Sequence, residues 1–253
     1  MGNSTSTFPI RDDPVQLKKL SVVIPALNEE KNIGNTLNSL KHHGLDNDPE
    51  VIVVDGDSTD DTPRIVKQCG AQVVSSARGR GVQLNAGWKK ATGDWVLFLH
   101  ADSLLPPGYG AMIERELSNR KAPIWGCFEG IKTDISGWSM RVVEWGVRAR
   151  TRWLHMPYGD QAVFIDRHTL TSMHGFKTYP LLEDVDMVRR LGAIAAPAIV
   201  PASVTTSGRR WEKVGVWQTM VLNQCVIMGY HLGVDIGTLS RLYESTGVRR
   251  SKS

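Results

Sequence analysis

The first hundred residues alternate between short apolar runs and longer stretches in which apolar residues recur every three or four positions. The runs are rich in β-branched residues and stop at polar or turn-forming residues, which predicts strands. The periodic stretches predict amphipathic helices; Ile33, Leu37 and Leu40, for example, share one helical face. Alternating strands and helices are typical of a parallel sheet with right-handed crossovers. The predicted strands cover residues 20–25, where Pro25 is expected to end the strand, 51–55, 72–75 and 95–99.

The second half of the chain is less regular. Residues 124–131, 162–166 and 198–206 predict further strands, and a helix is expected from 181 through Leu191. Residues 138–153 predict an amphipathic helix in which tryptophan and valine alternate with arginine. Residues 217–232 are mostly apolar but interrupted by polar side chains, so we expect a helix packed on the sheet rather than one that spans a membrane.

Length and composition suit one large α/β domain. With 253 residues, 41% of them hydrophobic, the chain can bury a substantial core. We expect a disordered tail over residues 1–16, one folded domain over 17–245 and a basic tail over 246–253. The three cysteines lie far apart and lack the spacing of a metal site, which indicates reduced thiols.

Charge and the N-terminal segment indicate where the protein acts. A formal net charge of +4 is too small to favour nucleic acid as a partner. The N-terminal segment has no apolar core of a signal peptide, so a cytoplasmic protein is expected. Residues 1–6 fit the N-myristoylation pattern with Gly2 as the acceptor. Together with the basic helix over 138–153, this pattern keeps peripheral contact with an anionic membrane open as an alternative to a solvated helix face.

Polar side chains follow the predicted strands. Asp102 comes after the fourth strand, and Asp55 and Asp57 come at the end of the second. Open α/β sheets bind ligands at the carboxyl ends of their strands, where a carboxylate can hold a hard cation or a phosphate-bound ligand. Arg78 and Arg80, beside a predicted helix start, can hold phosphates. Singly, each has a structural alternative, such as Asp102 capping a turn or Arg80 lying solvated on the surface.

Five different short motifs lie along the chain, starting at Val23, Val53, Leu99, Glu183 and Arg209. They read Val-Ile-Pro-Ala-Leu-Asn-Glu, Val-Val-Asp-Gly-Asp-Ser-Thr-Asp, Leu-His-Ala-Asp, Glu-Asp and Arg-Arg-Trp. In this order and spacing they make the chain resemble a family 2 glycosyltransferase of the GT-A fold. The resemblance covers roughly residues 20–245. It implies a single α/β domain with a mostly parallel twisted sheet flanked by helices, a Rossmann-like nucleotide-binding half and an acceptor-binding half.

Two further stretches, residues 78–87 and 157–161, are similar to the short bacterial-type branch of selenium-domain-associated glycosyltransferases. The resemblance implies inverting transfer from a UDP- or GDP-linked sugar, with Mg²⁺ or Mn²⁺ held by Asp102. The sequence departs from the family pattern at two positions: His100 replaces the first acid of Asp-x-Asp, and Gly56 stands where many members carry Asp. The identity of the nucleotide base, uridine or guanosine, therefore stays open. The donor-binding residues implied are Pro25, Asn28, Glu29, Asp55, Asp57, Arg78, Arg80, Gln83, His100, Ala101 and Asp102.

The second half is expected to bind the acceptor, which the resemblance does not identify. Inverting transfer needs a base for the proton of the acceptor hydroxyl, and by resemblance and position Asp184 is that base. Glu183, beside Asp184, is also predicted as catalytic. Arg210 is predicted as catalytic because a guanidinium can neutralise a departing diphosphate. The structural alternatives are first-turn acids that interact with the helix dipole and a surface arginine pair beside a core tryptophan. The predicted acceptor-binding residues are Tyr158, Gly159, Asp160, Gln161 and Trp211.

Two other functions fit parts of the sequence. The second predicted strand and its turn match the first motif of haloacid-dehalogenase-like phosphatases, in which Asp55 would accept the phosphoryl group and Asp57 would act as acid and base. That match leaves the other motifs without a role. A catalytically silent nucleotide-sugar-binding protein is a third hypothesis, suggested by His100, although intact Asp102 and Asp184 argue against it.

Overall fold

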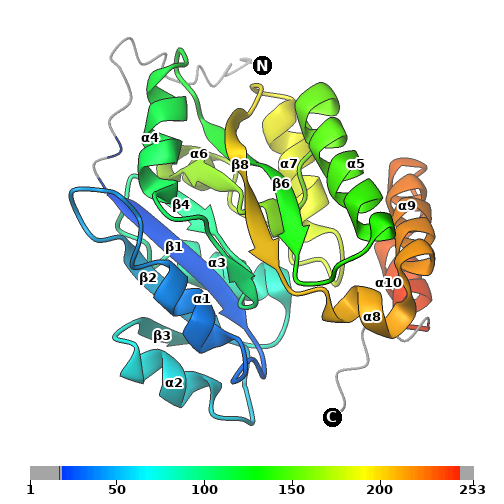
Figure 1. The fold of residues 1–253 in the computed structure, drawn as a ribbon, viewed down its shortest axis with the longest axis horizontal. Coiled ribbons are helices and arrows are strands. Elements are labelled where there is room, and N and C mark those ends of the chain that lie inside the picture. The colour runs from blue at the N-terminus through cyan, green and yellow to red at the C-terminus, as the bar shows by residue number, and fades with distance from the viewer. Residues whose placement is uncertain (1–16, 18, 246–253) are drawn as a thin grey trace, which may run out of the picture.

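Buried apolar runs form the strands of one sheet in the computed structural model, which describes residue 17 and residues 19–245 (Figure 1). The predictions for residues 1–16 and 246–253, acylation of Gly2 included, lie outside the described residues. Within them the sheet has eight strands in the order β3-β2-β1-β4-β7-β6-β8-β5. The strands are β1 (Leu20–Ala26), β2 (Glu50–Asp55), β3 (Gln72–Ser75), β4 (Trp95–Phe98), β5 (Ser103–Leu104), β6 (Trp125–Thr133), β7 (Phe164–Asp166) and β8 (Ala198–Thr206).

The first four strands pair in parallel, β3 with β2, β2 with β1 and β1 with β4. β7 then pairs antiparallel with both β4 and β6, β6 and β8 are parallel, and β5 is antiparallel to β8. Contrary to the prediction, β1 does not end at Pro25 but continues to Ala26. A mostly parallel α/β sheet with flanking helices was predicted, and the structure confirms it.

Helices cover both faces of the sheet, which explains why β1 and β4 are mostly apolar and buried along nearly their whole length. Ile33 of α1, Val66 of α2 and Ile113 of α4 pack on one face, and Leu84 of α3 and Leu191 of α7 pack on the other. The helices are α1 (Ile33–Ser39), α2 (Thr62–Gln68), α3 (Arg80–Trp88), α4 (Tyr109–Ser118), α5 (Trp138–Leu154), the 3₁₀ helix η1 (Gly159–Gln161), α6 (Arg167–Ser172), α7 (Glu183–Gly192), α8 (Arg209–Val214), α9 (Val216–His231) and α10 (Ile236–Ser245).

The C-terminal helices lie beside α5 and α7 (Figure 1). Leu182, just before α7, packs with Val226 of α9, and Asp186 accepts hydrogen bonds from Arg190 Nε at 2.7 Å and the Tyr230 hydroxyl at 3.1 Å. The most extensive contacts of α9 are with α10, α8 and α5, and Val216 and Met220 at its N-terminal end join the cluster around Ile131 of β6, so the helix packs mainly on other helices rather than on the sheet as predicted. Its apolar residues are spread around the helix and contact several neighbouring helices. In the described part of the chain, no helix combines the length and the apolar character needed to cross a membrane.

Candidate functional site

Arg209 joins two carboxylates that come from different strand ends. Glu29 lies in the loop after β1, and Asp102 lies in the turn between β4 and β5. Arg209 Nη2 donates to Glu29 Oε1 at 2.7 Å, to Glu29 Oε2 at 2.8 Å and to Asp102 Oδ2 at 3.0 Å. Partial burial lowers the pKa of Arg209, but the hydrogen bonds and charges of Glu29 and Asp102 outweigh this effect and raise it. The guanidinium is thus a fixed cation between the two carboxylates.

The sequence pointed to this arginine pair but gave the catalytic role to Arg210, whose side chain lies outside the described part of the structure. Arg209 was missed as a partner of Glu29 and Asp102. Successive residues on a helix point about 100° apart, so an adjacent pair does not reveal which side chain faces the sheet. The signal in the sequence was the pair itself, following directly on a strand-like run.

The loops after β1 and β2 hold each other through hydrogen bonds. Asn28 Oδ1 accepts from Thr59 N at 2.8 Å, and Ser58 Oγ accepts from Asn28 N at 2.9 Å. Asn28 and Asp57 have φ angles of 55° and 70°, a left-handed conformation that Asn and Asp tolerate better than most residues. Asp55 Oδ2 accepts from Ser58 N at 3.2 Å, whereas Asp55 Oδ1 is buried and has no hydrogen-bond partner among the described residues. Asp55 therefore offers a buried acceptor to the hydroxyl or imide of a ligand.

The two predicted phosphate-binding arginines point to different places. Arg78 Nη2 lies 3.3 Å from the carbonyl oxygen of Asp57 and 3.7 Å from Asp57 Oδ2, beside the loop after β2. Arg80 Nε lies 3.0 Å from Glu183 Oε1, at the start of α7. This second contact is an ion pair only, because Arg80 Nε makes no hydrogen bond to any residue that the structure describes. Glu183 is buried against Arg80, where it supports the guanidinium, and its catalytic role stays a prediction.

Gln83 ties the ends of β1 and β2 together. Its Nε2 donates to Ala26 O at 2.8 Å and to Val54 O at 3.0 Å, and the side chain is buried. The amide nitrogen of Gln83 is therefore used inside the protein, and direct donor binding by this residue stays a prediction. A Cβ atom at Gly56 would lie only 2.8 Å from Gln83 Nε2. This contact gives a steric reason for glycine at a position where many members of the resembled family carry aspartate.

Two backbone N–H groups position the Asp184 carboxylate. Asp184 Oδ2 accepts from Gly159 N at 2.8 Å, and Oδ1 accepts from Val185 N at 2.8 Å. A Cβ atom at Gly159 would lie 2.8 Å from Asp184 Oδ2 and 3.0 Å from Arg80 Nη2. The carboxylate and the guanidinium therefore meet at Gly159, and the absence of a side chain there permits it.

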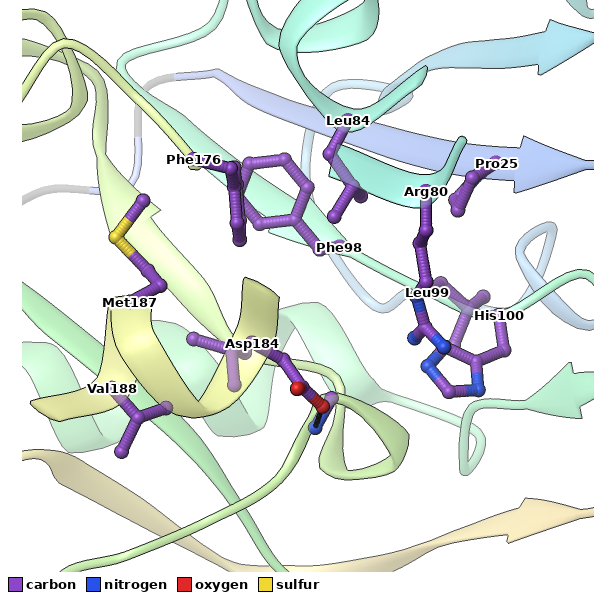
Figure 2. A pocket seen from close by; sticks show the side chains of 12 residues that line it. Pro25, Arg80, Leu84, Phe98, Leu99, His100, Phe176, Asp184, Met187 and Val188 are labelled. Carbon is purple, nitrogen blue, oxygen red and sulfur yellow. Dashed lines mark hydrogen bonds between the residues drawn. The ribbon is translucent and has the colours of Figure 1, made fainter. Parts of the chain in front are cut away.

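Asp184, Arg80 and His100 line one pocket; in Figure 2 Arg80 and His100 lie on the right, Met187 and Val188 on the left, and Asp184, from the same helix as Met187 and Val188, lies between them. The rest of the lining is mostly apolar and comes from β1, α3, β4, α7 and the loops beside them. It comprises Pro25, Leu84, Phe98, Leu99, Gly159, Val163, Phe176, Met187 and Val188. Ala101, which was predicted to bind the donor, is buried, and its carbonyl oxygen accepts a hydrogen bond from Thr36 Oγ1 at 2.8 Å.

Gln161 is completely buried. Its Nε2 donates to Thr151 Oγ1 at 2.7 Å and to Phe128 O at 2.9 Å, while its Oε1 accepts from Arg150 Nη2 at 3.0 Å and from Tyr158 N at 3.1 Å. An amide has few further hydrogen bonds to make once both of its ends are used in this way. The buried amide therefore fixes the η1 turn, and acceptor binding by Gln161 stays a prediction.

The remaining residues predicted to bind the acceptor lie in different surroundings. The guanidinium carbon of Arg150 lies 3.5 Å from the centroid of the Tyr158 ring, a cation–π contact. Asp160 is partly exposed as a residue, but its Oδ1 is buried and has no hydrogen-bond partner among the described residues. Burial raises the pKa of Asp160 and outweighs the opposing charge of Arg150. Trp211 is half-buried and packs with apolar residues of β6 and α5, among them Ile131, and its acceptor contact stays a prediction.

The carboxylates present fit a divalent ion only in part. Among the described residues, no group of three or more His, Cys, Asp or Glu side chains could hold a metal ion. Asp102 and Glu29 do supply carboxylate oxygens at a place that already attracts a cation. Mg²⁺ commonly binds through one or two carboxylates and takes its other ligands from water and phosphates. The residues therefore suit a metal ion that binds together with a diphosphate.

Comparison with known proteins gives the family. The model of glycosyl transferase family 2 matches residues 21–180. An uncharacterised glycosyltransferase of Rickettsia typhi is 40% identical over 90 residues, which are 35% of this chain and 30% of that protein. The matched part is thus less than two-thirds of the length of that relative.

Solved structures show the same fold. Glucosyl-3-phosphoglycerate synthase from Mycobacterium tuberculosis, in complex with Mn²⁺, UDP and glucosyl-3-phosphoglycerate, has a TM-score of 0.54 and 25% identity over 74% of this chain and 70% of that one. A mannosyltransferase from Pyrobaculum calidifontis, in complex with GDP-Man and Mn²⁺, has a TM-score of 0.58 and 18% identity over 86% and 68%. Because the family model covers more than half of the chain and these structures share its curled α/β sheet, the protein belongs to glycosyl transferase family 2 and has the GT-A fold.

Proposed function

We propose that this protein transfers a sugar from a nucleotide diphosphate sugar to an acceptor hydroxyl, with inversion at the anomeric carbon. One observation carries the proposal: Asp184 lines the same pocket as His100, which lies two residues before Asp102. Asp102 itself lines a second pocket, with Thr36 and Thr206, so in this proposal the candidate base and the cation-binding carboxylate act from two pockets that both reach the end of β4. Displacement of a diphosphate by a hydroxyl needs both groups.

The donor side of the proposal uses the strand-end loops. UDP accompanies the mycobacterial synthase and GDP-Man the archaeal mannosyltransferase, so we propose a UDP- or GDP-linked donor. The buried Asp55 Oδ1 would accept a hydrogen bond from the nucleoside, and Arg78 would lie near the phosphates. Asp102 would hold Mg²⁺ or Mn²⁺, which neutralises negative charge on the diphosphate when it is bound. Arg209, already in contact with Asp102, would turn to the same diphosphate.

The acceptor side uses Asp184. Its two backbone hydrogen bonds hold the carboxylate in one orientation, and each oxygen keeps a further lone pair. In the proposed reaction Asp184 takes the proton of the acceptor hydroxyl while the hydroxyl oxygen forms the new bond to the anomeric carbon. The bond from that carbon to the phosphate oxygen breaks, and the nucleoside diphosphate leaves with the electron pair.

A thermal-shift screen of UDP, GDP and their sugar conjugates, with and without Mn²⁺, tests the proposal. A ligand that binds only the folded state at about 100 times its Kd stabilises it by about 2.7 kcal/mol, so a true donor will raise Tm. We expect Asp102→Asn to lose the Mn²⁺-dependent shift and Asp184→Asn to keep it. The proposal fails if no nucleotide shifts Tm. Release of phosphate from phosphomonoesters that is abolished by Asp55→Asn would instead favour the phosphatase hypothesis.

A further inference from the structure

Helices α5 and α9 present a large apolar surface to solvent. The side chains of three tryptophans on α5 are mostly exposed: Trp138 at 70%, Trp145 at 65% and Trp153 at 71%. Trp217 at the start of α9 is 50% exposed, and its ring centroid lies 5.7 Å from that of Trp138. The two helices therefore share one continuous surface, which we call the tryptophan face. Its other exposed apolar members are Val142 of α5, Val221 and Met228 of α9, and Leu232 just after α9.

The opposite side of α5 accounts for the stability of this helix. Met140, Val143 and Val147 are buried and pack with Ile131 of β6. The exposed tryptophans are therefore not needed for the core, and burying such a side chain elsewhere would be favourable by about 2 kcal/mol or more. Contiguous apolar patches of this kind on a soluble protein mark a binding surface.

An exposed arginine lies at the edge of the tryptophan face. Helix α5 contains four arginines and one acid, Glu144, which turns inward and accepts a hydrogen bond from Thr133 N at 3.0 Å. Arg150 also points inward, to Gln161, and Arg148, although exposed, donates to Ser203 Oγ of β8 at 3.0 Å, which leaves Arg141 as the exposed arginine at the edge of the face. The fourth, Arg152, is paired with Glu129 at 3.1 Å. Helix α9 has no Asp, Glu, Lys or Arg at all.

Tryptophan with arginine at its edge is the composition that suits the headgroup layer of a bilayer. The indole ring is apolar yet carries an N–H group, so tryptophan concentrates at the membrane interface, and arginine reaches anionic headgroups from beside it. An amphipathic helix of this type lies in the plane of the interface. This agrees with the finding that no described helix could cross a membrane.

We propose that the tryptophan face docks on the surface of an anionic lipid bilayer. Only helix α8, which begins at Arg209, and Gly215 separate α9 from the Glu29–Arg209–Asp102 cluster. Docking would therefore hold the candidate site close to the lipid surface. The proposal depends on exposed side chains of α5 and α9 and not on the transfer chemistry, so either proposal can fail without the other.

Vesicle flotation of the full chain, produced without an acyl group on Gly2, tests the docking. We expect binding to phosphatidylcholine vesicles that contain phosphatidylserine, weaker binding in high salt, and little binding to phosphatidylcholine alone. Arg141→Gln should weaken binding about five-fold, the effect of one basic residue near an anionic surface. Trp145→Ala combined with Trp153→Ala should remove most of it.

The matched control is Arg115→Gln on α4, a helix on the far side of the molecule from α9 (Figure 1). It removes the same charge and should leave vesicle binding unchanged, and all variants should keep the Tm of the wild type. Two results overturn the proposal. One is a full chain that does not float with anionic vesicles. The other is a dimer in sedimentation velocity that the Trp145 and Trp153 substitutions convert to a monomer, since the face would then be a contact between two copies.

Discussion

Arg209 Nη2 lies 3.0 Å from Asp102 Oδ2 although the two residues are 107 positions apart in the sequence. The same nitrogen also contacts both carboxylate oxygens of Glu29. In the free protein the guanidinium thus supplies the positive charge that a divalent ion would bring to Asp102. Two cations at one carboxylate repel each other, so a metal ion and Arg209 are expected to compete until a diphosphate attracts both.

Arg209→Gln should therefore change metal binding and nucleotide binding in opposite directions. We expect Mn²⁺ to bind the nucleotide-free variant about five-fold more tightly, because a partly exposed ion pair is worth up to about 1 kcal/mol. Affinity for UDP or GDP should fall. Titration of Mn²⁺ followed by electron paramagnetic resonance measures the first effect. Arg64→Gln, which removes a surface arginine paired with Asp61 at 2.7 Å, is the control, and unchanged Mn²⁺ affinity in Arg209→Gln would contradict the prediction.

Asp184→Asn should lower kcat by roughly 10²- to 10⁴-fold, the usual contribution of a general base, while the donor Kd stays the same. The effects on kcat and on donor Kd are expected to separate because Asp184 lies in the first turn of α7 and not in the loops after β1 and β2. Single-turnover transfer and equilibrium donor binding measure the two quantities. Asp61→Asn, an exposed acid on the N-terminal side of α2, should change neither. Near-normal transfer by Asp184→Asn would remove this residue from the role of base.

Gly56→Ala should destabilise the fold by about 1–3 kcal/mol, the common cost of overpacking a filled site. The new Cβ would meet Gln83 Nε2 at 2.8 Å and push it from the two carbonyl oxygens that it bonds. Urea denaturation measures the change. Gly192→Ala is the matched control, because nothing lies within 4 Å of its Cβ, and it should be neutral or slightly stabilising in helix α7. Equal stability of Gly56→Ala and the wild type would show that Gln83 moves aside freely.

Asp160→Asn should change how stability depends on pH. Burial raises the pKa of Asp160 from its ordinary value of 3.8, so the folded protein holds this proton more tightly than the unfolded chain. That contribution to stability is fully present below pH 3.8 and is lost as pH rises through the raised pKa. Asparagine cannot ionise, so the variant should gain stability relative to the wild type over this window. Parallel Tm profiles of the two proteins above pH 3.8 would contradict the prediction.

Hydrophobic patterning was enough to predict most of the sheet and the helices on its two faces. β1, β2 and β4 are buried runs, and their parallel pairing brings Asp55 and Asp102 to the same edge. The motifs at those strand ends were enough to predict the family. Periodicity failed for α9, because a helix with apolar residues all round does not indicate which neighbour it packs against.

Where the sequence offers residues of the same chemical type, only the tertiary structure showed which contacts each side chain makes. Gln83 and Gln161 look like ligand-binding amides in a motif, but both are buried and bonded to the protein itself. Arg209 and Arg210 are equivalent in the sequence, and only the packing of α8 turns Arg209 toward Glu29.

The sequence by itself determined the fold class, the family and the strand edge that carries the site, because these depend on local patterning and on short motifs. Only the tertiary structure decided which polar groups are already satisfied and which face the site. That distinction depends on contacts between residues far apart in the chain, such as Gly159 with Asp184 and Arg209 with Asp102. Hydrogen bonds are short and directional, so a shift of about 1 Å decides whether a side chain binds a ligand or its own protein.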